Sequence, residues 1–197
     1  MNARTLIEAM NLWEASGSNI ASAAKETSEV LAHNGIPNLV AGGIAVQLHG
    51  YARFTNDVDL VVADIEKAHS LLLSKGFRQS LLKALAVVHP MFKVTIDLLP
   101  GGKSLEVRSQ VPFPVPRDAT AILQPVTMEE LIGLKLDSYV RATATRGQDK
   151  ADVEKLIINN RLPRELPGIH PAMVDLYHQI WDAIAAETSV QPNPPQS

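Results

Sequence analysis

The sequence contains no cysteine in 197 residues. Disulfide bonds, a thiolate nucleophile and zinc sites with sulfur ligands are therefore excluded. No apolar run approaches the roughly 20 residues that a membrane-spanning helix requires. A basic excess is also missing, because 18 Lys and Arg residues stand against 21 Asp and Glu residues, for a net charge of −3. This balance does not indicate bulk binding of nucleic acid, although it allows a local basic groove.

The overall composition is that of an ordinary soluble protein, with 46% hydrophobic and 20% charged residues. The length fits one domain, or one domain with a small helical appendage. The first residues lack the long apolar core of a signal peptide. We therefore expect a cytoplasmic protein with no membrane partner. The six histidines show no metal-ligand spacing, and no internal repeat is present.

Hydrophobic spacing and turn residues divide the first 126 residues into short elements. Helices are predicted over residues 3–15, from about 19 to 34, over 44–49 and between the N-cap Asp64 and Gly76. Strands are predicted over residues 38–41, 55–62, 86–88 and 92–99. Residues 103–126 contain four prolines and alternating apolar residues, which we interpret as short edge strands and loops.

Helical patterns dominate after residue 126. Thr127 and Glu130 fit a capping box, and further helices are predicted over 149–158 and 171–186. The sequence thus predicts an α/β (α+β) fold, with a mixed sheet flanked by helices and followed by a helical C-terminal part. The expected parts are N-terminal helices packing on the core (1–35), an α/β core (36–126), a helical part (127–187) and a disordered tail (188–197).

Two aspartates alternate with apolar residues in the strand predicted at 55–62. Asp57 and Asp59 are two positions apart, so their side chains share one face, with Cα atoms roughly 6.5–7 Å apart. Val58 and Leu60 face the core. Two carboxylates on one face of an apolar strand are costly unless a cation lies beside them.

Asp97 repeats the pattern in the strand predicted at 92–99, opposite the inward-facing Ile96 and Leu98. If the two strands are neighbours, three carboxylates converge. Magnesium prefers oxygen ligands and often binds carboxylates together with substrate phosphates. Two such ions can stabilise both the attacking and the leaving oxygen of a displacement at phosphorus.

The Gly42-Gly43 pair lies between a predicted strand and a predicted helix. Glycine permits close approach of a ligand to the backbone, and free N–H groups at such a turn attract phosphate. The combination of this turn with a downstream Asp-x-Asp is the specific signal, since a glycine pair alone is more often a tight turn.

These residues resemble the nucleotidyltransferase superfamily that includes DNA polymerase β. The run from Val40-Ala41-Gly42-Gly43 through Arg53-Phe54-Thr55-Asn56-Asp57-Val58-Asp59 is similar to its minimal and AbiEii-like toxin branch. Leu131-Ile132-Gly133-Leu134-Lys135 and Arg146-Gly147-Gln148-Asp149-Lys150-Ala151-Asp152 are also similar to that branch. The resemblance covers roughly residues 38–158 and is weak for any particular acceptor.

The resemblance implies a nucleotidyltransferase-like core that moves a nucleoside monophosphate from a nucleoside triphosphate (NTP) to a hydroxyl acceptor, with Mg²⁺ or Mn²⁺. It implies that Asp57, Asp59 and Asp97 bind metal, with Asp97 activating the acceptor. Gly42, Gly43 and Lys135 would hold phosphate, and we expect Arg53 and Thr55 in the same nucleotide site. One departure is that many members have serine at the position of Gly43, so a hydroxyl contact is lost here.

The acceptor is not defined by the sequence and could be tRNA, a protein or a small molecule. A toxin-like member would also need an antitoxin partner. The alternative from another class is an inactive module of the same fold that binds nucleotide or protein without turnover. The three carboxylates argue against it, because decayed sites usually lose one.

Each candidate residue also has a structural interpretation. The aspartates of the 55–62 strand could form a solvated strand face, and Asp97 could be a strand-end residue. Lys135 could extend from an amphipathic helix face to solvent. Arg53 and Thr55 could be exposed. Other charged residues are better explained as solvated or as favourable at a helix N-terminus: Asp149, Asp152, Arg141 and Arg146.

Overall fold

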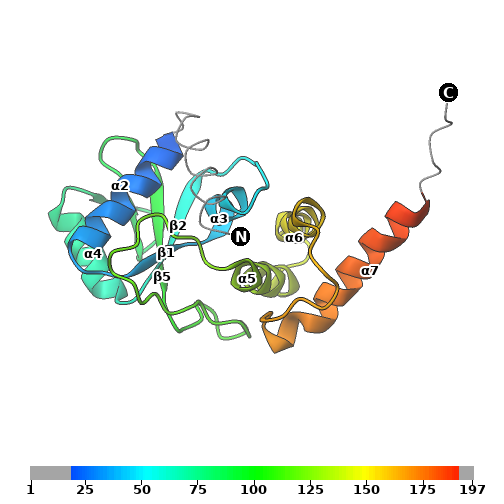
Figure 1. The fold of residues 1–197 in the computed structure, drawn as a ribbon. Helices are drawn as coiled ribbons and strands as arrows, with labels where there is room; N and C mark the ends of the chain where they lie inside the picture. Colours follow the sequence, from blue (N-terminus) through cyan, green and yellow to red (C-terminus); the bar gives the residue numbers. More distant parts are fainter. Residues whose placement is uncertain (1–18, 191–197) are drawn as a thin grey trace, which may run out of the picture.

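The computed structural model describes residues 19–190, with side chains up to residue 187. Figure 1 shows an α/β part built on one sheet and a helical part beside it, with α7 (Val174–Val190) farthest from the sheet. The helix predicted at 3–15 lies outside the described residues, as do residues 191–197.

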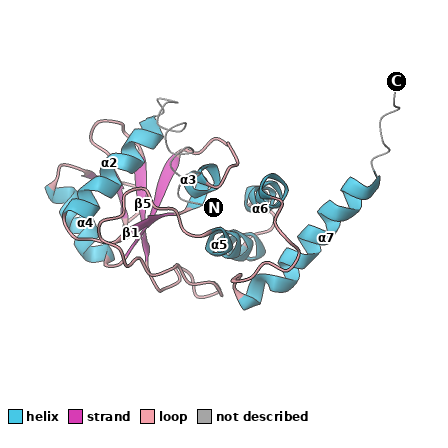
Figure 2. Cartoon of the chain, in the orientation of Figure 1, coloured by secondary structure: helices cyan, strands magenta, loops and turns pink. Residues whose placement is uncertain are grey.

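The order of elements confirms the predicted fold class, a mixed sheet with flanking helices followed by helices alone (Figure 2). The α/β part comprises α2 (Asn19–His33), β1 (Asn38–Val40), α3 (Gly42–Leu48), β2 (Asp57–Val62), α4 (Ile65–Ser74), β3 (Arg78–Gln79), β4 (Ala86–Val88) and β5 (Thr95–Pro100). After it come α5 (Met128–Arg141), α6 (Gly147–Asn160), the 3-10 helix η1 (Pro171–Met173) and α7.

The five strands form one sheet in the order β1-β2-β5-β4-β3. β2 and β5 are parallel neighbours at its centre, and the other pairs are antiparallel. A parallel pair needs a crossover connection, and here the chain passes through α4, β3 and β4 between β2 and β5. This crossover places the end of the loop before β2 and the start of β5 on the same edge of the sheet.

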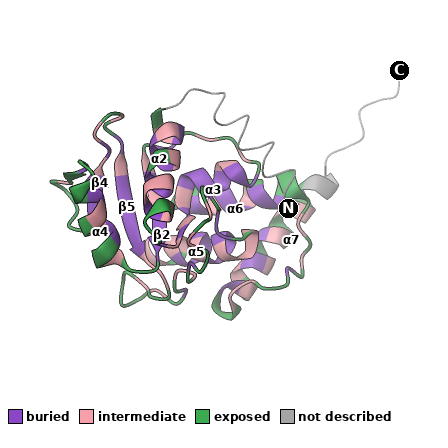
Figure 3. Cartoon of the chain, turned by 60° about the vertical axis from the view of Figure 1, so that its left-hand side comes forward, coloured by how far each residue is buried: buried purple, intermediate pink, exposed green. Residues whose placement is uncertain are grey.

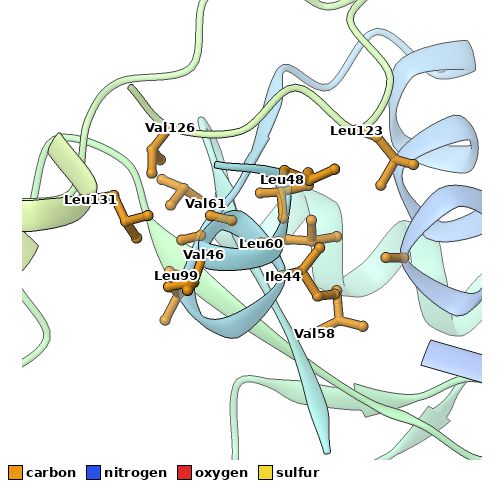
Figure 4. Packing of buried hydrophobic residues seen from close by; sticks show 14 of the residues in the cluster. Ile44, Val46, Leu48, Val58, Leu60, Val61, Leu99, Leu123, Val126 and Leu131 are labelled. Carbon is orange, nitrogen blue, oxygen red and sulfur yellow. The ribbon is translucent and has the colours of Figure 1, made fainter. Parts of the chain in front are cut away.

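The core lies between the sheet and its helices. α2 and α4 lie side by side against β2 and β5 (Figure 1), and Figure 3 shows the central strands as largely buried. α3 packs between β2 and α5. In Figure 4 the apolar side chains of α3 gather with those of the strands, among them Ile44, Leu48, Val58 and Leu60, all at most 1% exposed.

Two helix starts follow the predicted capping. The Asp64 carboxylate accepts a hydrogen bond from the Lys67 N–H (3.0 Å). The Thr127 hydroxyl accepts from the Glu130 N–H (3.2 Å), and the Glu130 carboxylate accepts from the Thr127 N–H (2.8 Å). Both pairs satisfy N–H groups that a helix leaves unpaired at its start. The second one fixes the beginning of α5, which forms one wall of the site.

The prediction for residues 103–126 was partly wrong. The whole segment is described, and it contains loops and one isolated bridge, Val40 to Pro125, but no strand. Its prolines have no N–H to donate to a ladder. The segment instead covers the free edge of β1, where the Val40 N–H donates to the Gln124 carbonyl (2.7 Å) and the Val126 N–H to the Val40 carbonyl (2.9 Å).

Smaller differences concern element ends. β2 begins at Asp57 and β5 at Thr95, each later than predicted, and the two-residue β3 was not predicted. α7 continues to Val190, so the boundary predicted at residue 188 lies inside this helix. None of the helices within residues 19–190 is both long enough and apolar enough to span a membrane.

Candidate active site

The three predicted carboxylates meet at the centre of the sheet. β2 and β5 pair in a register that sets Asp59 opposite Asp97 and Asp57 opposite Thr95. Because i and i+2 share a face, Asp57 projects on the same side as Asp59. Val58 and Leu60 are fully buried on the other side. The convergence expected from the sequence is therefore present, since the strands are neighbours.

The carboxylates open into a cavity of about 520 Å³ between the sheet and the helical part. Its wall includes Gly42 and Gly43 of α3, the segment 53–57 before and at the start of β2, and Lys135 of α5. All eight residues predicted for the site thus face one cavity, together with residues of the loop 105–113 and of α5 that were not predicted.

The negative charges of the cluster are only partly offset by the lysines near it. The pKa of Asp59 is raised from 3.8 to about 6, first because burial removes water from the carboxylate and then because Asp57 and Asp97 are negative. Asp97 is 9% exposed, and its Oδ1 is buried without a hydrogen-bond partner among the described residues. A buried carboxylate oxygen in this state favours a nearby cation.

The two glycines are required by their close approach to this cluster. Gly42 has a φ of +58°, and a Cβ there would lie 1.8 Å from Oδ2 of Asp59. A Cβ on Gly43 would lie 2.6 Å from Oγ1 of Thr55 and 2.9 Å from Nη2 of Arg53. A side chain at either position would therefore displace a predicted site residue. The Cβ of a serine at position 43 would meet the same contacts.

Arg53 and Thr55 are held in place before β2. The Thr55 hydroxyl lies 3.4 Å from Oδ1 of Asp57, and the Gln47 amide donates to the Arg53 carbonyl. Nε of Arg53 lies 3.0 Å from Oδ1 of Asp152 in α6. Neither side chain is merely solvated, because Thr55 is 8% exposed and Arg53 is only partly exposed.

Lys135 is at the cavity wall, but its ammonium group is already paired. Nζ lies 2.7 Å from Oδ1 of Asp149 and 2.8 Å from Oδ2 of Asp152, and the residue is 8% exposed. The interpretation of Lys135 as a side chain extending to solvent is therefore wrong. It is one member of a buried network in which Arg53 and Lys135 face Asp149 and Asp152.

Asp149 and Asp152 correct a second sequence interpretation. They are 8% and 0% exposed, so the preference of acids for helix N-termini does not account for them. A signal was present in the sequence, because the buried residues of α6 recur at helical spacing: Asp149, Asp152, Val153, Leu156 and Ile157. A carboxylate in the buried stripe of a helix needs a partner.

Lys83 is a further site residue that the sequence did not indicate. It lies in the loop between β3 and β4, and its Nζ forms an ion pair with Oδ2 of Asp97. This hydrogen bond is the main cause of the raised pKa of Lys83, with Asp57 and Asp59 contributing through their charge. No motif or periodicity marks this lysine.

The outer part of the cavity contains further ion pairs. Nη1 of Arg141 lies 2.6 Å from Oε1 of Glu106, and its Nε lies 3.1 Å from Oδ2 of Asp137. We expected Arg141 from the sequence to be a solvated residue of a helix face, and these ion pairs show that it is not. Arg146 is more exposed, 3.9 Å from Asp149. His49 is buried elsewhere, 2.8 Å from the Val126 carbonyl, and is not part of the cavity wall.

Within residues 19–190, no three His, Cys, Asp or Glu side chains are grouped tightly enough to enclose a metal ion as they stand. The oxygen donors that could hold a hard cation are the carboxylates of Asp57, Asp59 and Asp97. Their fit to such an ion rests on the unpartnered Oδ1 of Asp97 and on the like charges around Asp59.

No family model and no curated protein matches the chain. Among solved structures, the crystal structure of ANT(2")-Ia in complex with adenylyl-2"-tobramycin is 10% identical, with a TM-score of 0.48 over 82% of this chain and 94% of that one. The solution structure of the antibiotic-resistance factor ANT(2'')-Ia is 13% identical, with a TM-score of 0.44 over 87% of this chain and 91% of that one.

Proposed function

We propose that the protein transfers a nucleoside monophosphate from an NTP to a hydroxyl acceptor, in a reaction that depends on Mg²⁺ or Mn²⁺. The observation that supports this most directly is the register of β2 and β5, which sets Asp59 opposite Asp97 with Asp57 on the same face. Three carboxylates converge beside a glycine pair in one cavity of about 520 Å³. This combination suits a metal-bound triphosphate.

Asp57, Asp59 and Asp97 would hold the metal ions. Bound there, divalent cations would neutralise the triphosphate and stabilise the charge that develops on the attacking and leaving oxygens. The chain itself supplies the oxygen ligands and keeps two of them in register through the backbone pairing of β2 with β5. This pairing fixes the spacing of the carboxylates before any ligand arrives, which lowers the reorganisation that binding requires.

The phosphates would lie at Gly42 and Gly43, where the absence of Cβ atoms leaves the backbone open to the cavity. Arg53 and Thr55 lie next to Gly43 and would contact the same groups. Lys135 would add positive charge from α5. Its ammonium group already pairs with Asp149 and Asp152, and Nε of Arg53 pairs with the same Asp152, so the two cations would act on the phosphates through one shared network.

In the reaction, the acceptor oxygen would form a bond to the α-phosphorus while the bond from that phosphorus to the bridging oxygen breaks. Pyrophosphate leaves, and the proton of the acceptor hydroxyl passes to the carboxylate of Asp97. Positioning and charge stabilisation supply most of the rate in such transfers. The acceptor hydroxyl would belong to RNA, a protein or a small molecule. The toxin-like role with an antitoxin rests on the sequence resemblance alone.

The test uses NTPs labelled at either the α- or the γ-phosphate, incubated with Mg²⁺ and with cellular RNA, protein or a small-molecule extract. We expect the α label on one acceptor and the γ label in pyrophosphate. Without an acceptor, slow hydrolysis should give nucleoside monophosphate and pyrophosphate. Transfer of the γ label, or hydrolysis to diphosphate and phosphate, would contradict the proposal.

Substitutions of single carboxylates test the separate roles of Asp97 and Asp57. Asp97→Asn should lower transfer by about a hundredfold to ten-thousandfold, the usual contribution of general-base assistance, while nucleotide binding falls only modestly. Asp57→Asn should weaken metal binding and nucleotide binding together. Asp64→Asn is the matched control, because it makes the same change at an exposed helix cap.

The alternative is a nucleotide-binding module without turnover, and one observation favours it. Lys83 pairs with Asp97, the proposed activating carboxylate, as the structure stands. If that pair persists when nucleotide is bound, Asp97 is not free to accept a proton. Nucleotide binding that is equal in wild type and Asp97→Asn, together with no formation of pyrophosphate in either, would support the module.

A further inference from the structure

Lys83 contacts the carboxylate cluster from a loop that is largely exposed. It belongs to the loop 80–85, and its side chain is 54% exposed, so it reaches the cluster from the mouth of the cavity. The loop gains little from apolar burial, because Leu81 and Leu82 are 100% and 93% exposed. Something other than hydrophobic packing must therefore hold Lys83 in position.

Backbone carbonyls of the loop provide that support. The side-chain amide nitrogen of Gln79, Nε2, lies 3.2 to 3.3 Å from four backbone carbonyl oxygens, those of Ser80, Lys83, Ala84 and Ala86. The Leu98 N–H in β5 donates to the Leu85 carbonyl (3.0 Å), which ties the loop to the strand of Asp97. The Gln79 side chain is thus one of the polar groups that hold the loop carrying Lys83, together with the Ser80 N–H, which donates to the Ala86 carbonyl (3.0 Å).

The ion pair engages the same carboxylate group that a metal would bind. Lys83 occupies Oδ2 of Asp97, and Oδ1 of the same carboxylate has no hydrogen-bond partner among the described residues. The ammonium group offsets one of three clustered negative charges. A divalent cation at this point would bring two positive charges within a few ångströms of the ammonium, and like charges at that distance repel strongly in a partly buried site.

We propose that Lys83 is the resident counterion of the carboxylate cluster and that a divalent cation displaces it from Asp97. The inference rests on the proposed function, because it takes Asp57, Asp59 and Asp97 as the metal ligands. Lys83 then has two effects. It stabilises the protein when no metal is bound, and it lowers the affinity for metal because its ion pair must be broken first.

Lys83→Met removes the charge and keeps an unbranched side chain at a half-exposed position. A charge-assisted hydrogen bond of this kind, reduced by solvent exposure, corresponds to about tenfold in a binding constant. We therefore expect nucleotide-free Lys83→Met to bind Mn²⁺ about tenfold more tightly than wild type in a calorimetric titration. Lys67→Met, an equal change of charge at an exposed residue of α4, should bind Mn²⁺ as wild type does.

Thermal unfolding gives a second measurement that needs no activity. In EDTA, Lys83→Met should unfold at a lower temperature than wild type, and the difference should close at saturating Mn²⁺, because the stability that metal binding adds rises with the logarithm of the affinity. Gln79→Leu should resemble Lys83→Met in part, since it loosens the loop without changing any charge. Lys83→Arg keeps the charge and should stay close to wild type.

The outcomes separate this inference from the proposed function. If wild type binds Mn²⁺ and Lys83→Met binds it equally or less tightly, Lys83 is not a competing counterion, and the metal site stands without it. If neither protein binds Mn²⁺, the metal part of the proposed function fails and the inference fails with it. Tighter binding by Lys83→Met, with the unchanged control, supports both.

Discussion

Gly42→Ala probes the contact between the glycine turn and the carboxylates. The substitution has two effects that can be separated. The residue has a φ of +58°, and an L side chain in the left-handed region costs about 1–2 kcal/mol. In addition, the new Cβ would lie 1.8 Å from Oδ2 and 2.7 Å from Cγ of Asp59, distances that no atom pair tolerates.

The clash is relieved most easily by rotation of the Asp59 side chain. An off-rotamer side chain costs about 0.5–1.5 kcal/mol, so the total loss of unfolding free energy is about 1.5–3.5 kcal/mol. The functional cost is larger, because the carboxylate leaves its position opposite Asp97. Loss of one ligand contact worth at least about 1.4 kcal/mol would weaken Mn²⁺ binding at least tenfold.

Gly35→Ala is the matched control. Gly35 has a similar φ of +69°, but nothing lies within 4 Å of the position that a Cβ would take. Urea unfolding should therefore show a loss of about 1–2 kcal/mol for this variant, while calorimetry shows unchanged Mn²⁺ affinity. If Gly42→Ala binds Mn²⁺ like wild type, or if Gly35→Ala weakens binding equally, the turn does not act through Asp59.

Three further predictions concern stability. Asp152→Asn should lower the unfolding free energy in urea by about 3 kcal/mol, because it removes one partner of a buried ion pair and leaves Arg53 and Lys135 with fewer carboxylates. His49 has a pKa below 6.5 because burial disfavours its charged form, so the folded state binds fewer protons than the unfolded one. The stability that the neutral His49 contributes to the folded state is complete above pH 6.5 and is lost as the pH falls below that value. His49→Gln should therefore reduce the loss of unfolding free energy between pH 7 and pH 5. Thr127→Ala should cost about 1 kcal/mol through loss of the capping box.

Each of these three predictions can be contradicted by a specific result. Asp182 pairs with Arg164 on the surface, so Asp182→Asn should change stability little; a loss as large as that of Asp152→Asn would mean that burial does not govern the effect. An unchanged pH dependence in His49→Gln would assign the acid sensitivity to other groups, His89 among them, whose pKa burial also lowers. Unaltered stability of Thr127→Ala would mean that α5 is fixed by packing alone.

Local patterns predicted the parts of the site that depend on neighbours in sequence. Alternation in β2 placed Asp57 and Asp59 on one face, because the side-chain period of a strand is fixed by its geometry. The caps at Asp64 and Thr127 were predicted for the same reason, since their partners are three residues away. Asp97 needed one further condition, the pairing of its strand with β2, which the sequence left open.

Residues whose partners are distant in sequence could not be assigned in this way. Lys83 reaches Asp97 from 14 residues away, and Arg53 reaches Asp152 across 99 residues, through an arrangement of helices that no spacing encodes. For Asp152, its place in the apolar stripe of α6 was a usable signal. For Lys83, flanked by exposed leucines, there was none.

The central claim is that nucleotide and divalent cation bind as one unit at the three carboxylates. Calorimetric titration with a non-hydrolysable NTP analogue, in Mg²⁺ and in EDTA, tests it without knowledge of the acceptor. In wild type, affinity should fall at least about tenfold when Mg²⁺ is removed, and Asp59→Asn should bind weakly under both conditions. Equal affinity of wild type with and without Mg²⁺ would contradict the account.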